Sequence, residues 1–223
     1  MTPAHLTPIS GPTRDALITG DPRRAFALAQ ALTVQPKMSH QSRGLWGYTG
    51  ETETGHPLTV QSTGAGGPAS IAVIGDLAGL GVERLVRLGT CVARQGEHSP
   101  GDVILVERTI CRDGTGVRLE SAGDEATPDP GLIALLEAVA PRATVSSHDF
   151  VSRFDPDGPA PAEGASARDL QTGAMLAFAR RLGVAAAAVL VVAGDETGER
   201  LAEDALAEAF TEAGLEIVAG LEK

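Results

Sequence analysis

Short aliphatic segments alternate with helical patterns along most of the chain, and this alternation constrains the fold more than any other feature. The expected strands are residues 16–19, 45–52, 57–63, 85–88, 103–108, 116–119, 144–147 and 185–193. The expected helices are residues 22–32, 64–80, 132–140, 168–182 and 198–213. Because strands that alternate with helices tend to pair in parallel and be covered on both faces, the pattern predicts an α/β fold with a largely parallel sheet.

The length and composition indicate one domain. A chain of 223 residues, 43% of them hydrophobic, can bury one large core, and we expect a single domain over residues 1–223. Residues 155–166 (DPDGPAPAEGAS) interrupt the pattern, because they are rich in Pro, Gly, Ala and acidic residues. This composition predicts a flexible surface loop.

Charge, hydropathy and cysteine content exclude several classes of protein. The net charge of −11 and the scattered Lys and Arg residues disfavour nucleic acid as a partner. No apolar run approaches the roughly 20 residues of a membrane span, and the N-terminus lacks the pattern of a secretory leader. Cys91, Cys111 and five dispersed histidines do not form a metal-binding motif. We therefore expect a cytoplasmic protein with reduced thiols, no metal and no membrane partner.

Four residues in glycine-rich contexts suit an anion: Arg24, Arg43, Arg87 and Thr90. An acidic chain repels phosphate, so a bound phosphate needs a strong local cluster. Gly20 permits a sharp turn, and the helix expected from residue 22 directs free N–H groups toward an oxyanion. Guanidinium groups add paired hydrogen bonds. Each arginine taken alone is more commonly explained as a residue that caps a helix C-terminus or pairs with an acid on the surface. The arginines in motif order are not well explained in this way.

The order and spacing of these motifs carry a family resemblance. Residues 19–24 (TGDPRR), 62–68 (STGAGGP) and 86–90 (VRLGT) resemble the nucleoside phosphorylases of the purine nucleoside phosphorylase and uridine phosphorylase superfamily. The glycine block is most similar to uridine phosphorylases, whereas residues 43–50 (RGLWGYTG) are similar to bacterial hexameric purine nucleoside phosphorylases. The resemblance covers residues 5–106 and returns, weaker, over residues 169–195.

The resemblance implies a mixed central sheet curled into a distorted barrel with flanking helices. It implies homodimers with shared active sites that can assemble into a hexamer. Inorganic phosphate would be the co-substrate, with no other cofactor. Its ligands would be Gly20, Arg24, Arg87 and Thr90, with Arg43 from the partner subunit. His5 of the partner would bond the ribose 5′-hydroxyl.

The same resemblance assigns the ribose to residues 169–171. Asp169, Leu170 and Gln171 stand where the family has Glu-Met-Glu. Replacing the second glutamate by Gln171 predicts a grip on the ribose that is weaker by about 1–1.5 kcal/mol, or about tenfold. Asp169 has an alternative interpretation as an exposed acid in the first turn of a helix, where it favours the helix dipole.

At the base end, the resemblance points to Cys91, Val92 and Phe150. Val92 stands where the family has glycine and would reshape the pocket, and the thiol of Cys91 is interpreted as a small buried hydrophobe. The Gln-x-Arg pair that reads uracil is missing after Phe150, with Arg153 as a speculative substitute. Asp195 matches an aspartate that protonates the base, a role that needs a raised pKa. Alternatively, Asp195 caps the last helix.

The expected function is phosphorolysis of a nucleoside, with Arg87 and Asp195 as catalytic residues. Uridine-like and purine nucleosides remain equal candidates. Two alternatives stay open: a nucleosidase that uses water, and a catalytically weak relative that binds a nucleoside or phosphate as a sensor. Retention of all three arginines favours phosphorolysis, whereas Gln171, Val92 and the missing base-reading pair favour the sensor.

Overall fold

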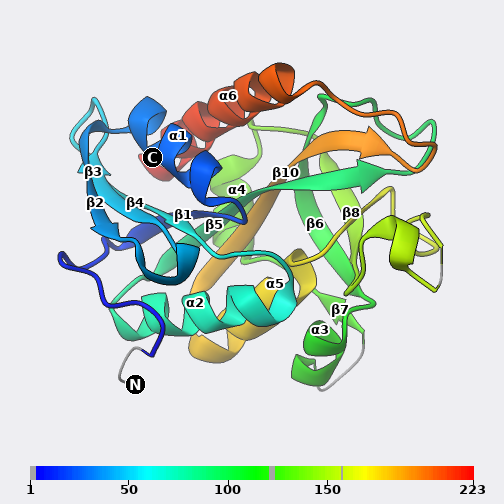
Figure 1. The fold of residues 1–223 in the computed structure, drawn as a ribbon, viewed down its shortest axis with the longest axis horizontal. Coiled ribbons are helices and arrows are strands. Elements are labelled where there is room, and N and C mark those ends of the chain that lie inside the picture. Colours follow the sequence, from blue (N-terminus) through cyan, green and yellow to red (C-terminus); the bar gives the residue numbers. More distant parts are fainter. Residues whose placement is uncertain (1–3, 121–123, 157) are drawn as a thin grey trace.

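A mixed sheet of ten strands organises the computed structural model, which describes residues 4–120, 124–156 and 158–223 (Figure 1). The strands are β1 (Asp15–Thr19), β2 (Val34–His40), β3 (Gly47–Glu51), β4 (Pro57–Ser62), β5 (Arg84–Ala93), β6 (Val103–Cys111), β7 (Glu125–Ala126), β8 (Arg142–Ser147), β9 (Ala167–Asp169) and β10 (Ala185–Asp195). The α-helices are α1 (Pro22–Leu32), α2 (Gly67–Gly79), α3 (Gly114–Leu119), α4 (Pro130–Leu136), α5 (Thr172–Leu182) and α6 (Glu203–Leu221). Two 3₁₀ turns lie at Ser42–Gly44 and Ser152–Phe154.

The sheet closes on itself through β10. This strand pairs in parallel with β5 and antiparallel with β6, while β6, β8, β9 and β5 continue the ring. On the other side of β5, the sheet extends through β1, β4, β3 and β2. The predicted α/β fold with a distorted barrel is therefore confirmed. Because β1, β4, β5 and β10 run in parallel, their carboxyl ends meet at one edge, where such sheets collect ligands.

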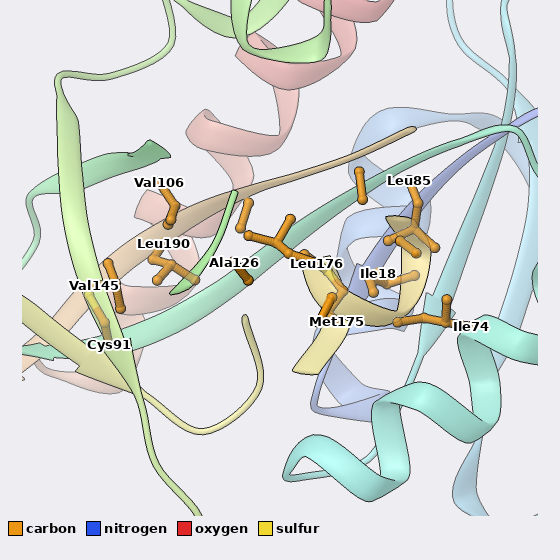
Figure 2. Packing of buried hydrophobic residues seen from close by; sticks show 14 of the residues in the cluster. Ile18, Ile74, Leu85, Cys91, Val106, Ala126, Val145, Met175, Leu176 and Leu190 are labelled. Carbon is orange, nitrogen blue, oxygen red and sulfur yellow. The ribbon is translucent and has the colours of Figure 1, made fainter. Parts of the chain in front are cut away.

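Helices cover both faces of the sheet (Figure 1). Residues of α2 and α5 pack on one face, in a cluster that includes Ile74, Met175 and Leu176 together with Leu190 of β10 (Figure 2). Residues of α1, α4 and α6 pack on the opposite face against a second cluster. Burial on both faces explains why β10 reads as an almost continuous aliphatic run rather than an alternating one.

Local signals place the start of α1 where the sequence predicts it. Asp21 caps the helix by accepting a hydrogen bond from the backbone N–H of Arg23 at 2.7 Å, and Pro22 occupies the first turn. The short helix α4 begins in the same way, because Asp129 accepts from the N–H of Leu132 and Pro130 follows it.

The observed elements differ from the expected ones in several places. Residues 116–119 form part of helix α3 rather than a strand. The buried Asp113 caps this helix, because its carboxylate accepts a hydrogen bond from the N–H of Gly116. Strand β2 was not predicted, since it lies at the sheet edge with mostly exposed side chains. Residues 168 and 169 belong to β9, so α5 begins only at Thr172. The last helix begins at Glu203 rather than 198.

The segment predicted as a flexible loop is irregular, but hydrogen bonds attach its described residues to the barrel. Asp155 accepts from Arg168 Nη2 at 2.5 Å, and its side chain is only 3% exposed. Arg94 donates to the carbonyl of Ala162 at 2.9 Å, and the N–H of Ala162 donates to Ser146 Oγ at 3.0 Å. In the described part of the chain, no helix is long and apolar enough to cross a membrane.

Candidate active site

A cavity of about 280 Å³ opens at the carboxyl ends of the parallel strands. Predicted site residues in its lining are Gly20, Arg24, Arg87, Thr90, Cys91, Val92, Phe150, Asp169, Leu170 and Gln171. The other lining residues are Thr19, Ala65, Gly66, Gly89, Val151, Arg168, Ala193 and Arg200. The structure thus brings together most of the residues that the sequence analysis selected from motifs far apart in the chain.

One end of the cavity is formed by the turn between β1 and α1. Gly20 lies in that turn, and α1 begins beside it. Pro22 has no N–H, and the N–H groups of Arg23 and Ala25 donate to Asp21. The backbone N–H of Arg24 is therefore the donor of the first helical turn that an anion could use. The guanidinium carbon of Arg24 stacks on the ring of Phe210 at 4.8 Å from its centroid. Among the described residues, Arg24 has no ion-pair partner, so its donors remain available to an anion.

Arg87 is buried and held on three sides. Its Nη1 donates to Gln171 Oε1 at 2.6 Å, its Nη2 to Asp169 Oδ2 at 3.1 Å and its Nε to Thr172 Oγ1 at 3.3 Å. The guanidinium lies directly over Gly89, where a Cβ atom would overlap it. The glycine two residues after Arg87 therefore lets this side chain lie flat on β5 beside Thr90.

Asp169 is a buried carboxylate that accepts hydrogen bonds from other protein groups, and not an exposed acid in the first turn of a helix. Its side chain is fully buried, and Ser147 Oγ donates to it at 2.5 Å. The hydroxyl and the N–H of Thr172 donate to its Oδ2 at 2.6 and 3.0 Å. Together with Arg87, these donors occupy both carboxylate oxygens. The interpretation as an exposed acid in the first turn of a helix is wrong, because residue 169 is buried and ends β9, although its carboxylate accepts from the N–H of Thr172 at the start of α5.

Asp195 lies at the end of β10 and is not in the cavity lining. The Thr197 hydroxyl donates to its Oδ1 at 2.6 Å, and the N–H groups of Thr197 and Glu199 donate at 2.9 and 3.2 Å. These hydrogen bonds hold the pKa of Asp195 below its usual range, and the bond from the Thr197 hydroxyl has the largest effect. The raised pKa expected of a proton donor is therefore not found in the unliganded chain. Asp195 caps a turn, not a helix, since α6 begins later and follows Ala202.

The opposite end of the cavity is more open. Phe150 and Val151 are about half exposed there, and Val92 pairs with Arg168 across β5 and β9. Cys91 is buried beneath them, and burial raises the pKa of its thiol far above the ordinary value. This agrees with the interpretation of Cys91 as a hydrophobe, because a buried thiol stays protonated.

Two predicted residues lie outside the cavity of their own chain. The backbone N–H of His5 donates to Asp76 Oδ2 at 2.6 Å, which attaches the N-terminal segment to α2. Arg43 is exposed, in the left-handed region with φ of 59°. Both were expected to act on a partner subunit rather than on their own cavity.

Sequence reasoning missed two arginines of the lining. Arg168 was assigned to a helix, but β9 turns it toward the cavity, where Phe150, Asp155 and Gly158 accept its hydrogen bonds. Arg200 is exposed and has no ion-pair partner in the described chain. Gly194 was the available signal for it, because a side chain there would overlap Arg200. The speculative substitute, Arg153, instead stacks on Phe154 at 4.7 Å and is not in the lining.

No group of His, Cys, Asp and Glu side chains suitable for a metal ion is found in the described ranges. The charged side chains of the lining are four arginines and the buried Asp169. Such a cavity can bind an anion and, beside it, a mostly apolar or aromatic group.

Comparison with known proteins gives a consistent family. The model of the phosphorylase superfamily matches residues 14–221. A DeoD-type purine nucleoside phosphorylase of Geobacillus sp. is 30% identical over 81% of this chain and 83% of its own length. A guanosine phosphorylase of Halorubrum lacusprofundi is 30% identical over 81% of this chain and 78% of its own length. A DeoD-type relative from Oceanobacillus iheyensis is 39% identical, but this match spans 41% of this chain and only 39% of the relative.

The fold is also similar to a solved structure. The crystal structure of a purine nucleoside phosphorylase from Toxoplasma gondii, in complex with immucillin-H, superposes with a TM-score of 0.81. The match covers 94% of this chain and 90% of the other, at 21% sequence identity. At that identity, the similarity concerns the architecture.

Proposed function

The chain belongs to the phosphorylase superfamily, and from that membership we propose that it is a nucleoside phosphorylase. It would transfer the pentose of a nucleoside to inorganic phosphate, as a pentosyltransferase, and release the free base. The substrate would be a purine or a uridine-like nucleoside. Purine nucleosides are favoured by the names of the relatives, which include purine nucleoside and guanosine phosphorylases.

One observation carries the proposal: two arginines from separate motifs converge on one cavity beside a helix N-terminus. Arg24 and Arg87 line it together with Gly20 and Thr90. The positive charge of Arg87 is offset by Asp169, whereas that of Arg24 is not paired in the described chain. Phosphate would therefore be attracted by Arg24 and the first turn of α1, and oriented by Arg87 and Thr90.

The reaction would proceed by displacement at the anomeric carbon of the sugar. A phosphate oxygen forms a bond to that carbon as the bond to the base nitrogen breaks, and the electron pair of the broken bond leaves with the base. Leu170 provides an apolar surface for the sugar, and the anionic phosphate stabilises its developing positive charge. Preorganised charges of this kind provide much of an enzyme's rate acceleration.

Charge on the departing base would be neutralised at the open end of the cavity. Arg200 lies there without an ion-pair partner in the described chain, and Phe150 and Val92 offer apolar contacts to the ring. Asp195 would protonate the base only after a bound ligand raises its pKa, because in the unliganded chain that pKa is lowered.

We also propose that the functional unit is a homodimer, able to assemble into a hexamer. His5 and Arg43 lie outside the cavity of their own chain, so they can reach a substrate only from a neighbouring subunit. The enzyme would act in the cytosol and need no cofactor beyond phosphate. Sedimentation tests this assembly, since a strict monomer contradicts a shared site.

The direct test follows base release from inosine, adenosine and uridine with and without phosphate. Release that depends on phosphate supports the proposal. Release that is independent of phosphate identifies a nucleosidase, and binding without release identifies a sensor. Either of these two outcomes overturns the assignment as a phosphorylase.

A further inference from the structure

Gln171 connects three segments of the cavity wall through its side-chain amide. We propose that this amide is a positioning element that holds the glycine turn at residues 64–66 and orients Arg87, rather than a weakened ligand of the ribose. The consequence for turnover rests on the proposed function, whereas the effect on the turn does not.

The amide is buried, with Gln171 only 3% exposed. Its Nε2 donates to the carbonyl of Gly64 at 2.5 Å and lies 3.2 Å from the carbonyl of Gly66. A third contact, to Thr63 Oγ1, measures 3.3 Å. On the other side, its Oε1 accepts from Arg87 Nη1 at 2.6 Å. Both N–H bonds of the amide are therefore directed at acceptors of the protein itself.

The surroundings determine which way the amide points. In the reverse orientation, the NH₂ group would face the guanidinium donors of Arg87 and the oxygen would face the carbonyls of the glycine turn. Each of those contacts would pair two donors or two acceptors. The position thus requires an acceptor on one side and a donor on the other, which an amide supplies.

The other hydrogen bonds to the glycine turn come from its sequence neighbours: the Thr63 hydroxyl donates to the Gly64 carbonyl at 3.0 Å, and the N–H of Ser70 donates to the Gly66 carbonyl at 3.2 Å. Gly64 and Gly66 both have positive φ, at 77° and 83°, a region that glycine enters freely and most residues avoid. Gly66 is the N-cap of α2 and supplies no side-chain hydrogen bond to the helix. Ala65 and Gly66 line the cavity. An amide that binds the carbonyls on both sides of Ala65 therefore sets the shape of this part of the wall.

A glutamate at position 171 would not fit this arrangement. Its carboxylate has no N–H to give, so negative oxygens would face the carbonyls of Gly64 and Gly66. One oxygen could still accept from Arg87, but the turn would lose the donor that Gln171 provides, and its carbonyls would face a negative charge. The family comparison, in which glutamate grips the ribose, predicts that Gln171→Glu improves activity about tenfold. The positioning role predicts the opposite sign.

The test compares Gln171→Glu with Gln171→Met, which has a similar length and no charge. Gln30→Glu on the exposed side of α1 is the matched control for the change of charge. We expect Gln171→Glu to lower kcat/KM by about tenfold or more and to raise the KM for phosphate, with a smaller loss for Gln171→Met. Amide hydrogen exchange at Thr63 and Ser70, whose N–H groups donate to the carbonyls of Thr19 and Gly66 on either side of the turn, should accelerate in both variants and be unchanged in the control.

The two readouts separate the inference from the function on which it rests. If the wild-type chain releases no base with phosphate, the phosphorylase assignment fails, and faster exchange at Thr63 and Ser70 still supports the positioning role. Unchanged exchange in both variants, or a Gln171→Glu enzyme as active as the wild type, overturns that role. Should Gln171→Glu fail to fold, Gln171→Met provides the same exchange measurement.

Discussion

At one end of the cavity, Arg87 is 6% exposed in its side chain and bound by three acceptors, whereas at the other end Arg200 is exposed and has no ion pair in the described chain. The first arrangement is set before any ligand arrives. The exposed side chain of Arg200 can instead change its conformation when a ligand binds. If the function proposed above holds, the end proposed for phosphate is preorganised by the protein, while the end proposed for the base is completed by the substrate.

The buried end also couples function to stability. Arg87 and Asp169 neutralise each other inside the protein, so neither can be removed without leaving an unpaired charge. Arg200 has no such role. Substitutions at the buried end should therefore affect both folding and turnover, and substitutions at the open end should affect turnover alone.

The largest effect is expected for Arg87→Met. Removing the cation leaves Asp169 buried without its partner, which should lower the free energy of unfolding by about 3–5 kcal/mol. Phosphate-dependent turnover should fall about 10³-fold, as for loss of a preorganised donor. Denaturant unfolding and steady-state kinetics measure the two effects.

Arg108→Met is the control, because its pair with Glu125 is exposed on both sides, at 42% and 46%. Its loss should cost less than about 1 kcal/mol. If the Arg87→Met protein is as stable as this control, then the ion pair between Arg87 and the buried Asp169 does not contribute to the free energy of unfolding as proposed.

Gly89→Ala should separate positioning from folding. The added methyl group overlaps the guanidinium of Arg87, which is the far end of a flexible side chain and can shift. We expect a smaller loss of stability than in Arg87→Met, because the cation stays inside the protein, and about a 10²-fold loss of kcat/KM because the guanidinium is displaced by roughly 1 Å. Gly11→Ala is the control, since no atom lies within 4 Å of a Cβ at that position. Equal activity of the two variants would show that the position of Arg87 over Gly89 is unimportant.

A smaller effect is expected for Arg200→Ala at the open end. Losing one charged donor to the base should lower kcat/KM for the nucleoside about tenfold. The KM for phosphate and the melting temperature should stay unchanged. Arg23→Ala, with a side chain 83% exposed beside Asp21, serves as the control. A raised KM for phosphate in Arg200→Ala would contradict the proposal that this residue acts on the base, because it would indicate a role in phosphate binding.

The smallest effects concern two aspartates that accept hydrogen bonds in turns. Burial raises the pKa of Asp113 to about 6, above the unfolded value of about 3.9, so ionisation destabilises the folded state as pH rises through this window. Asp113→Asn should therefore raise the melting temperature at pH 7.5 by about 2–4 °C, and the gain should vanish below about pH 4. Thermal scans from pH 4 to 7.5 measure it.

Asp195 should show the opposite sign. Its pKa is lowered in the folded chain, so its ionised form stabilises the fold above the unfolded pKa, and this contribution is lost as pH falls through the folded pKa. Asp195→Asn should lower the melting temperature slightly at pH 7.5. A gain at neutral pH in this variant would contradict the contrast between the buried and the exposed carboxylate.

Much of the buried end could be predicted from short motifs. Gly20, Arg24 and Arg87 lie in segments where turn chemistry and strand ends are local properties, and the family resemblance of these short motifs was enough to select them. The open end could not be predicted in this way. Arg168 and Arg200 reach the cavity because β9 joins the barrel and because the segment before α6 folds back over Gly194, and neither event leaves a clear local pattern.

The chain's own sequence determined the α/β class, the caps of α1 and α4, and the motifs of the proposed anion-binding end, because these depend on periodicity and on neighbours a few residues away. Only the tertiary structure decided the closure of the barrel through β10, the burial of Asp169 and the orientation of the Gln171 amide. Each of these depends on contacts between residues up to about a hundred positions apart, such as Gln171 with Gly64. A hydrogen-bond partner at that separation is chosen by packing, not by local preference.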